Sequence, residues 1–167
     1  MSKLNKIAIK VLSNGKGILA ADESTGTMTK RLESVNVSSS IKNRLLFRET
    51  LFSSDGMKNC IGGVILYDET IKQTSNLKLP IPKLISNLGS IPGIKVDTGA
   101  KKLALSNSET ITEGLDGLRE RLKEYYDLGA RFTKWRGVFK ISTENNLPTL
   151  ESIKANAHAL GRYLSLI

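Results

Sequence analysis

The stretch Gly17-Ile18-Leu19-Ala20-Ala21-Asp22-Glu23-Ser24-Thr25-Gly26 decides the fold of this 167-residue chain. Its first five residues form a continuous apolar run, which is typical of a strand buried on both faces of a parallel sheet. Polar residues follow at once, and residues 28–35 have a helical pattern. Because α/β folds place their chemistry between a buried strand and the next helix, Asp22 and Ser24 are candidate site residues. Helix capping alone would also explain both of them.

The same pattern recurs three more times along the chain. Each further apolar segment contains or ends in polar residues, and these segments are residues 61–68, 91–97 and 131–141. Helical patterns lie between them and after the last one. Strands that alternate with helices predict a parallel sheet with right-handed crossovers.

Several helix boundaries have local signals. Ser2 can cap a first helix, and Ser38-Ser39-Ser40 interrupts the chain before a helix over residues 41–52. Thr110-Ile-Thr-Glu113 resembles a capping box that opens a helix containing Tyr125. Pro148 suits the first turn of a last helix, whose predicted inner face carries Ile153, Ala157, Leu160, Leu164 and Ile167.

Cations occur on two of the predicted strands. Lys134 and Arg136 would share one face of the strand over residues 131–141, since alternate side chains of a strand point the same way. Two buried cations carry a heavy desolvation cost, so they either reach water at the strand end or hold an anion. A surface edge strand would also explain them, and the same alternative applies to Lys95.

Candidate polar residues thus lie at or near the carboxyl end of each predicted strand, which is typical of a TIM (β/α)₈ barrel. Such a barrel typically needs about 250 residues. We therefore predict an α/β fold in which this chain supplies roughly the first four β/α units. Residues 1–167 would form a single partial domain with no internal linker. The chain stops within an amphipathic helical pattern, so we expect the sequence to be a fragment.

Composition argues against several other classes of protein. The net charge is +9, but the 25 basic residues are scattered rather than gathered in a patch, so we expect no nucleic-acid binding. No apolar run could span a bilayer, and the N-terminus lacks a signal-peptide core. The lone Cys60 excludes an internal disulfide, and with the lone His158 it leaves no zinc-ligand cluster. We predict a cytoplasmic protein without a metal site or membrane contact.

Five blocks of sequence resemble the N-terminal half of class I fructose-bisphosphate aldolase, in the family's order and with similar spacing. The resemblance covers essentially the whole chain, although Thr98 stands where many members have lysine and Thr27 where many have serine. The five blocks are Gly17–Gly26, Cys60–Leu66, Gly93–Asp97, Gly114–Leu118 and Lys134–Arg136.

The resemblance implies a cofactor-free glycolytic lyase that reversibly cleaves fructose 1,6-bisphosphate into glycerone phosphate and glyceraldehyde 3-phosphate. In the family, a lysine forms a Schiff base with the ketose phosphate and so creates an electron sink. By resemblance, Asp22 lies near the reacting carbons, Lys134 orients Asp22 and assists proton transfer, and Lys95 contacts substrate oxygens. The matching substrate-binding positions are Ser24, Thr27, Arg31, Arg44 and Arg136.

The family's Schiff-base lysine lies on a later strand, in the half that these 167 residues do not include. We therefore expect the isolated chain to be inactive and the full-length parent to be an aldehyde-lyase that forms a homo-oligomer. An alternative is a non-catalytic half-barrel that binds phosphosugars or pairs with another half-barrel. A basic nucleic-acid-binding module is the third hypothesis.

Overall fold

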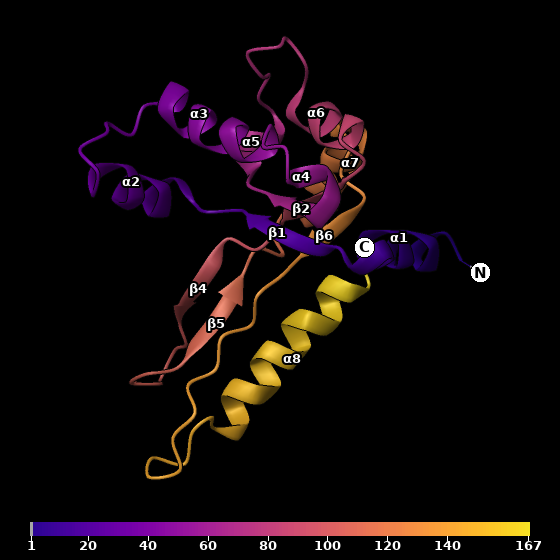
Figure 1. The fold of residues 1–167 in the computed structure, drawn as a ribbon. Helices are drawn as coiled ribbons and strands as arrows, with labels where there is room; N and C mark the ends of the chain where they lie inside the picture. The colour runs from indigo at the N-terminus through magenta and orange to yellow at the C-terminus, as the bar shows by residue number, and fades with distance from the viewer. Residues whose placement is uncertain (1) are drawn as a thin grey trace. The chain divides into compact units, whose positions relative to one another are not determined.

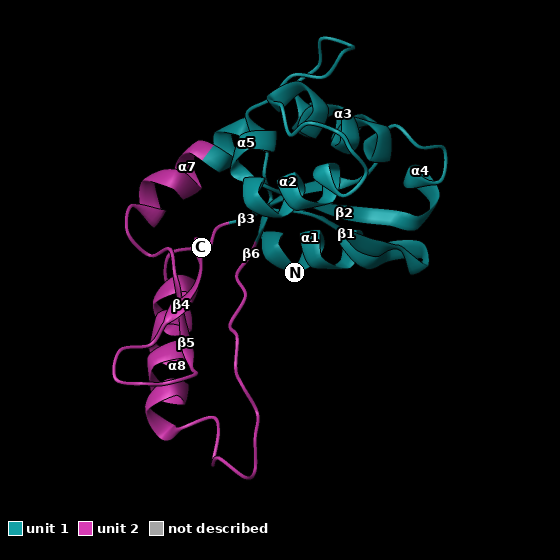
Figure 2. Cartoon of the chain, turned by 90° about the vertical axis from the view of Figure 1, so that its left-hand side faces the viewer, with its two compact units in different colours: residues 1–95, 125–133 teal, residues 96–124, 134–167 magenta. Residues whose placement is uncertain are grey.

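The computed structural model describes residues 2–167 and divides the chain into two compact units (Figure 2). Unit 1 contains the chain up to residue 95 together with residues 125–133, and unit 2 contains residues 96–124 and 134–167. The single partial domain predicted for residues 1–167 stays a prediction.

A four-stranded sheet with the order β1-β2-β3-β6 is the centre of unit 1 (Figure 1). Its strands lie where the apolar runs predicted them, and β1 with β2 and β2 with β3 pair in parallel. The α/β fold with a parallel sheet is therefore confirmed, whereas the complete barrel stays a prediction. The strands are β1 (Gly17–Ala21), β2 (Ile61–Leu66), β3 (Ile91–Lys95) and β6 (Phe132–Lys134).

The last strand of this sheet is much shorter than the sequence predicted. β6 ends at Lys134, and residues 135–141 have almost no regular secondary structure. Arg136 therefore lies beyond the strand, and the prediction that Lys134 and Arg136 share one face of it is wrong. Aromatic and β-branched residues favour a strand only where a neighbouring strand offers pairing.

Helices connect the strands, and serine caps begin three of them. The hydroxyls of Ser2, Ser24 and Ser40 each accept a hydrogen bond from the backbone N–H three residues ahead. The connecting segments are α1 (Lys3–Leu12), the 3-10 turn η1 (Ser13–Gly15), α2 (Thr25–Glu33), α3 (Ile41–Phe52), α4 (Met57–Cys60), α5 (Asp68–Ile71), α6 (Ile81–Asn87) and α7 (Leu118–Leu128).

Two glycines let the sheet pack closely on its neighbours in unit 1. A Cβ at Gly62 in β2 would overlap the backbone carbonyl of Val11 in α1. A Cβ at Gly93 in β3 would overlap the ring of Phe132 in β6. The apolar core around them is fully buried and includes Met28, Phe52, Val64, Leu66, Ile71, Ile81, Ile85 and Ile94.

Unit 2 contains an antiparallel hairpin that the sequence analysis missed. β4 (Gly99–Lys102) pairs with β5 (Thr110–Glu113), and Gly99 lies opposite Glu113. The predicted capping box at residues 110–113 is therefore wrong, and α7 begins only at Leu118. Thr110, Ile111 and Thr112 are β-branched residues, which suit a strand once a partner is available.

The last helix, α8 (Leu150–Leu164), begins with Thr149 as its N-cap, just after Pro148. Its predicted inner face is wrong, because Ile153, Leu164 and Ile167 are 42%, 63% and 55% exposed. The buried face is one residue removed and mostly polar or small, with Ser152, Asn156, Ala159 and Tyr163.

Polar side chains on the buried face of α8 form hydrogen bonds with backbone groups of the hairpin, which explains why this face is buried. Asn156 Oδ1 accepts a hydrogen bond from Thr112 N at 3.4 Å, and its Nδ2 donates to Thr110 O at 3.0 Å. Asn156 therefore supplies the donor and acceptor that a third strand would offer. Tyr163 adds apolar contact by stacking on Trp135, with ring centroids 5.3 Å apart.

We predict that Gly62→Ala destabilises the chain by about 1–3 kcal/mol, the usual cost of overpacking. The new methyl group would have to displace a backbone carbonyl, which cannot rotate away as a side chain could. Chemical denaturation measures the change. Gly161→Ala is the matched control, because nothing lies within 4 Å of that position in α8. The control should gain about 0.5–1 kcal/mol, and an equal stability of both variants would contradict the packing argument.

Candidate active site

The loop that follows β1 carries the first candidate residues. Asp22, Glu23 and Ser24 connect Ala21 to the first residue of α2, and all three are half-buried. Ser24 Oγ caps α2 and lies 3.2 Å from Thr27 Oγ1. The capping explanation is therefore confirmed for Ser24, while the predicted contacts of Ser24 and Thr27 with substrate stay predictions.

Arginines and glutamates form a cluster beside this loop in unit 1. Arg44 donates two hydrogen bonds to the carboxylate of Glu69, from Nε at 2.9 Å and from Nη2 at 2.5 Å. Arg48 lies one helical turn further along α3 and is completely buried. Arg31 on α2 pairs with the side chain of Glu23. The four-residue spacing of Arg44 and Arg48 puts them on one face of α3, but nothing in the sequence indicates that Glu23 and Glu69 are their partners.

The contacts within the cluster lower the pKa of Glu69, and burial lowers that of Arg48. Hydrogen bonds from Arg44 lower the pKa of Glu69 below its ordinary value, because they stabilise the carboxylate. Burial lowers the pKa of Arg48, since a desolvated guanidinium loses its hydration. Arg44 has Nη1 bonded to Ser39 O at 2.6 Å besides its two bonds to Glu69. Its predicted role in substrate binding would require an exchange of these partners.

Side chains also hold the backbone around Arg136 in unit 2. Asp97 is 6% exposed, and its Oδ2 accepts a hydrogen bond from Arg136 N at 3.4 Å. Thr112 Oγ1 donates to Arg136 O at 2.7 Å. Both backbone polar groups of Arg136 are thus occupied by side chains, and Val96 N donates to Lys134 O at 3.1 Å. Strand pairing ends at Lys134, and side chains hold the backbone of Arg136 beyond it.

The predicted site residues are distributed over both units. Lys95 is the last residue of β3, and Lys134 is the last residue of β6. The predicted convergence of Asp22 with Lys134 stays a prediction, since the two residues belong to different units. Unit 1 contains Asp22, Ser24, Thr27, Arg31, Arg44 and Lys95, and unit 2 contains Lys134 and Arg136.

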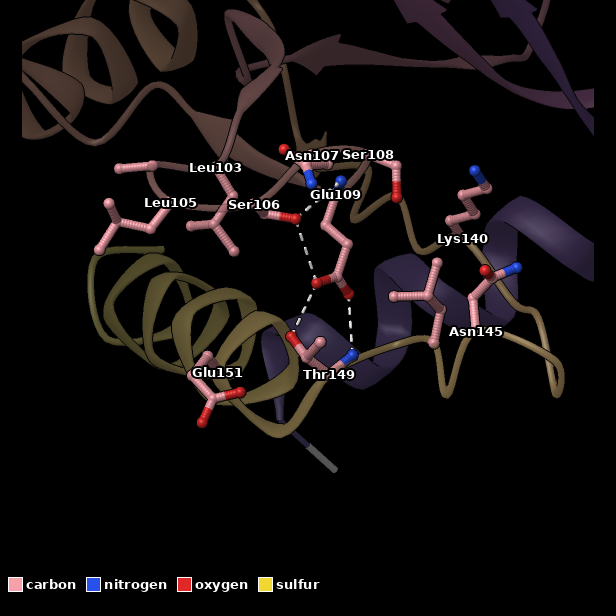
Figure 3. A pocket seen from close by; sticks show the side chains of 12 residues that line it. Leu103, Leu105, Ser106, Asn107, Ser108, Glu109, Lys140, Asn145, Thr149 and Glu151 are labelled. Atoms are coloured by element: carbon pink, nitrogen blue, oxygen red, sulfur yellow. Dashed lines mark hydrogen bonds between the residues drawn. The ribbon is translucent and has the colours of Figure 1, made fainter.

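An open pocket of about 630 Å³ lies in unit 2 between the hairpin loop and the start of α8 (Figure 3). Glu109 at its wall accepts hydrogen bonds from Thr149 N at 2.8 Å and from Thr149 Oγ1 at 2.7 Å. These hydrogen bonds lower the pKa of Glu109, because they stabilise its carboxylate. They also anchor the N-terminus of α8. None of the predicted site residues lines this pocket, so we assign the carboxylate of Glu109 a structural role.

Charged side chains at and after the ends of sheet strands are the arrangement of α/β enzymes, which gather their chemistry at the carboxyl ends of parallel strands. A family model described as "Glycolytic: Fructose-bisphosphate aldolase class-I" matches residues 3–167. The chain therefore belongs to the class I fructose-bisphosphate aldolase family, as the resemblance implied.

Individual relatives agree with this assignment. A probable fructose-bisphosphate aldolase class 1 of Xylella fastidiosa (strain 9a5c) is 48% identical over 99% of this chain and 49% of its own length. The cytosolic fructose-bisphosphate aldolase 6 of Arabidopsis thaliana is 52% identical over 89% of this chain and 41% of its own length. The chain thus spans about half the length of the curated relatives it matches.

A solved structure also matches the fold. It is fructose-bisphosphate aldolase from Plasmodium falciparum, in a ternary complex with TRAP and a small-molecule inhibitor. The TM-score is 0.93 at 45% identity, over 98% of this chain and 47% of the other. Separately, no helix within residues 2–167 is long and apolar enough to cross a membrane.

We predict that Glu69→Gln lowers the free energy of unfolding by about 1.5–3 kcal/mol at pH 7, the range for hydrogen bonds to charged groups. The folded-state pKa of Glu69 is lowered, so its contribution is complete above the ordinary pKa near 4.5. The contribution is lost as the pH falls through the lower folded-state pKa. Urea denaturation of both proteins between pH 7 and pH 3 should therefore show a difference that shrinks with acid.

The control for this titration is Glu33→Gln, which changes an exposed glutamate at the end of α2 in the same unit. It should alter stability little at any of these pH values. A difference between Glu69→Gln and the wild type that stays constant down to pH 3 would contradict the ion-pair explanation.

Proposed function

We propose that this chain supplies part of a class I fructose-bisphosphate aldolase active site, namely the residues that assist the Schiff-base lysine and some of those that bind substrate. One observation carries the proposal: the family match runs through residues 3–167, and it includes Asp22, Lys95 and Lys134 at or just after the ends of β1, β3 and β6. The rest of the site would lie in the part of the family's length that these residues do not cover.

The proposed reaction is the reversible cleavage of fructose 1,6-bisphosphate. A lysine outside the 167 residues condenses with the substrate carbonyl and releases water, which leaves an iminium cation. A base removes the proton of the C4 hydroxyl, the C3–C4 bond breaks, and its electron pair passes into the iminium as an enamine. Glyceraldehyde 3-phosphate leaves first, and protonation and hydrolysis then release glycerone phosphate.

The residues present have distinct roles in this scheme. Asp22 is the carboxylate near the reacting carbons, and Lys134 orients it and assists proton transfer. Lys95 contacts substrate oxygens. Phosphate groups suit the arginines, whose planar donors bind phosphate oxygens in pairs. The proposed substrate-binding residues are Ser24, Thr27, Arg31, Arg44 and Arg136.

The proposal extends to the whole protein. Its fold would be a (β/α)₈ barrel, in which the four-stranded sheet supplies the first four strands. We propose a homo-oligomer that acts in the cytoplasm without a cofactor. The lone Cys60 and the Arabidopsis relative named as cytosolic support this location.

We predict that the isolated 167-residue chain shows no aldol cleavage of fructose 1,6-bisphosphate. The reaction requires a lysine that forms a Schiff base with the substrate carbonyl, and by resemblance that lysine lies outside these residues, whereas Lys134 orients Asp22. Borohydride reduction in the presence of a ketose phosphate, followed by peptide mass spectrometry, is the direct test. A covalent adduct on Lys134 or Lys95 would show that the assigned roles are wrong.

In a full-length protein, Asp22→Asn and Lys134→Met should each lower kcat by about 10²–10⁴-fold, the usual effect of losing an acid–base partner. Asp55→Asn and Lys140→Met, which change exposed residues, serve as matched controls and should leave kcat unchanged. Binding of fructose 1,6-bisphosphate without any cleavage by the full-length protein would instead favour the non-catalytic phosphosugar-binding protein.

A further inference from the structure

A buried arginine contacts the middle of the loop that carries Asp22. The side chain of Arg48 is 0% exposed, and its Nη2 donates a hydrogen bond to the backbone carbonyl of Glu23 at 2.6 Å. Arg48 comes from α3, which lies 25 residues further along the chain. A charge-assisted bond to a loop carbonyl restrains the backbone dihedral angles on both sides of it.

The carbonyl of Glu23 lies between the two regular elements that flank the loop. β1 ends at Ala21, and the helical hydrogen bonds of α2 begin with the bond from Met28 N to Ser24 O at 2.9 Å. Between them, the carbonyl of Glu23 is held by Arg48. Asp22 is covalently bonded to Glu23, so loosening this anchor would let the loop segment that carries the Asp22 carboxylate move.

Arg48 is itself held from other elements of unit 1. Its Nη1 lies 3.7 Å from Glu69 Oε1 on α5, and its guanidinium lies 6.0 Å from the centroid of the Tyr67 ring at the end of β2. Glu69 is fixed in turn by its two hydrogen bonds from Arg44. The loop carbonyl is thereby connected to α3, α5 and the end of β2.

Burying the guanidinium of Arg48 in this way costs free energy of folding. Neither Nε nor Nη1 of Arg48 has a hydrogen-bond partner within residues 2–167, and the same holds for Glu23 Oε2. A buried charge with unsatisfied donors destabilises a fold relative to an apolar side chain of similar size. Arg48 therefore stabilises the fold less than an apolar side chain would. Its planar guanidinium can instead contact two partners at once and fix their relative positions.

We propose that Arg48 is a positioning residue, which sets the orientation of the Asp22 carboxylate by holding the carbonyl of Glu23. The catalytic part of this inference rests on the function proposed above for Asp22. The restraint of the loop does not, and it can be measured in the chain by itself.

Hydrogen exchange on the 167-residue chain, resolved by mass spectrometry, tests the restraint. Arg48→Met keeps the apolar stem and removes the charge, so the fold should persist. The amides of residues 22–25 should exchange about tenfold faster or more, while those of β2 stay protected. Unchanged exchange at residues 22–25 in the folded variant would overturn the proposal.

Two further variants complete this experiment. Arg121→Met is the matched control, because Arg121 also donates to backbone carbonyls, those of Val96 and Gly114, but in unit 2. It should leave residues 22–25 unchanged. Arg48→Lys keeps the charge without the fork, and we expect an intermediate acceleration. If Arg48→Lys exchanges like the wild type, or if neither Arg48 variant folds, Arg48 does not act by positioning and the proposal fails.

Kinetics of a full-length enzyme test the catalytic consequence. Borohydride trapping counts the intact active sites, and kcat is then expressed per trapped site. Arg48→Met should lower this kcat by about 10–100-fold with KM within about twofold, because misplacing a reacting group affects the chemical step. A purely structural residue would lower the number of trapped sites and leave kcat per site unchanged, and that result would overturn the catalytic role. A wild-type enzyme without cleavage would refute the proposed function, while the exchange experiment would still decide the restraint.

Discussion

The pairing of Glu69 with Arg44 and Arg48 is the interaction on which the arrangement of unit 1 around the β1–α2 loop depends. Through Arg44 it connects α5 to α3, and through Arg48 it reaches the loop that follows β1. Desolvation opposes this cluster, as the lowered pKa of Arg48 indicates. The carboxylate of Glu69 offsets part of that cost by facing both guanidinium groups.

In unit 2, the hairpin and the segment after β6 leave backbone groups without strand partners. Uncharged side chains satisfy several of them. Asn156 forms hydrogen bonds with the edge of β5 that has no strand partner, and Thr112 donates to the carbonyl of Arg136. The carboxylate of Glu109 accepts a hydrogen bond from Thr149 N and so fixes the start of α8. Each of these bonds is modest in net free energy, but an unsatisfied buried group in its place would cost more.

The sequence predicted the features that depend on local patterns. Apolar runs located the four strands of the sheet, and the serine caps located helix starts. It missed the hairpin, since residues 110–113 match a capping box as well as a strand, and only the partner strand decides between them. The predicted buried face of α8 was wrong. Amphipathicity identifies the apolar stripe, but the face that is buried carries Asn156, whose side chain forms hydrogen bonds with the backbone of the hairpin. The strand pattern pointed to Asp22 and Lys134 and the family resemblance supplied their roles, while the role of Arg48 depends on long-range contacts that no spacing encodes.

Exposure separates the three arginines beside the loop into two kinds. The side chains of Arg44 and Arg48 are 9% and 0% exposed and have protein partners, whereas that of Arg31 is 54% exposed beside Glu23. A phosphate that approached Arg44 would have to replace the two hydrogen bonds that Arg44 donates to the half-buried carboxylate of Glu69, and Glu69 would then be left without its main partner. The guanidinium of Arg31 stays near water whichever partner it binds, and Arg48 remains beside Glu23. Of the arginines assigned to substrate by resemblance in unit 1, Arg31 is therefore the one whose surroundings suit phosphate binding, and Arg44 suits the support of the loop.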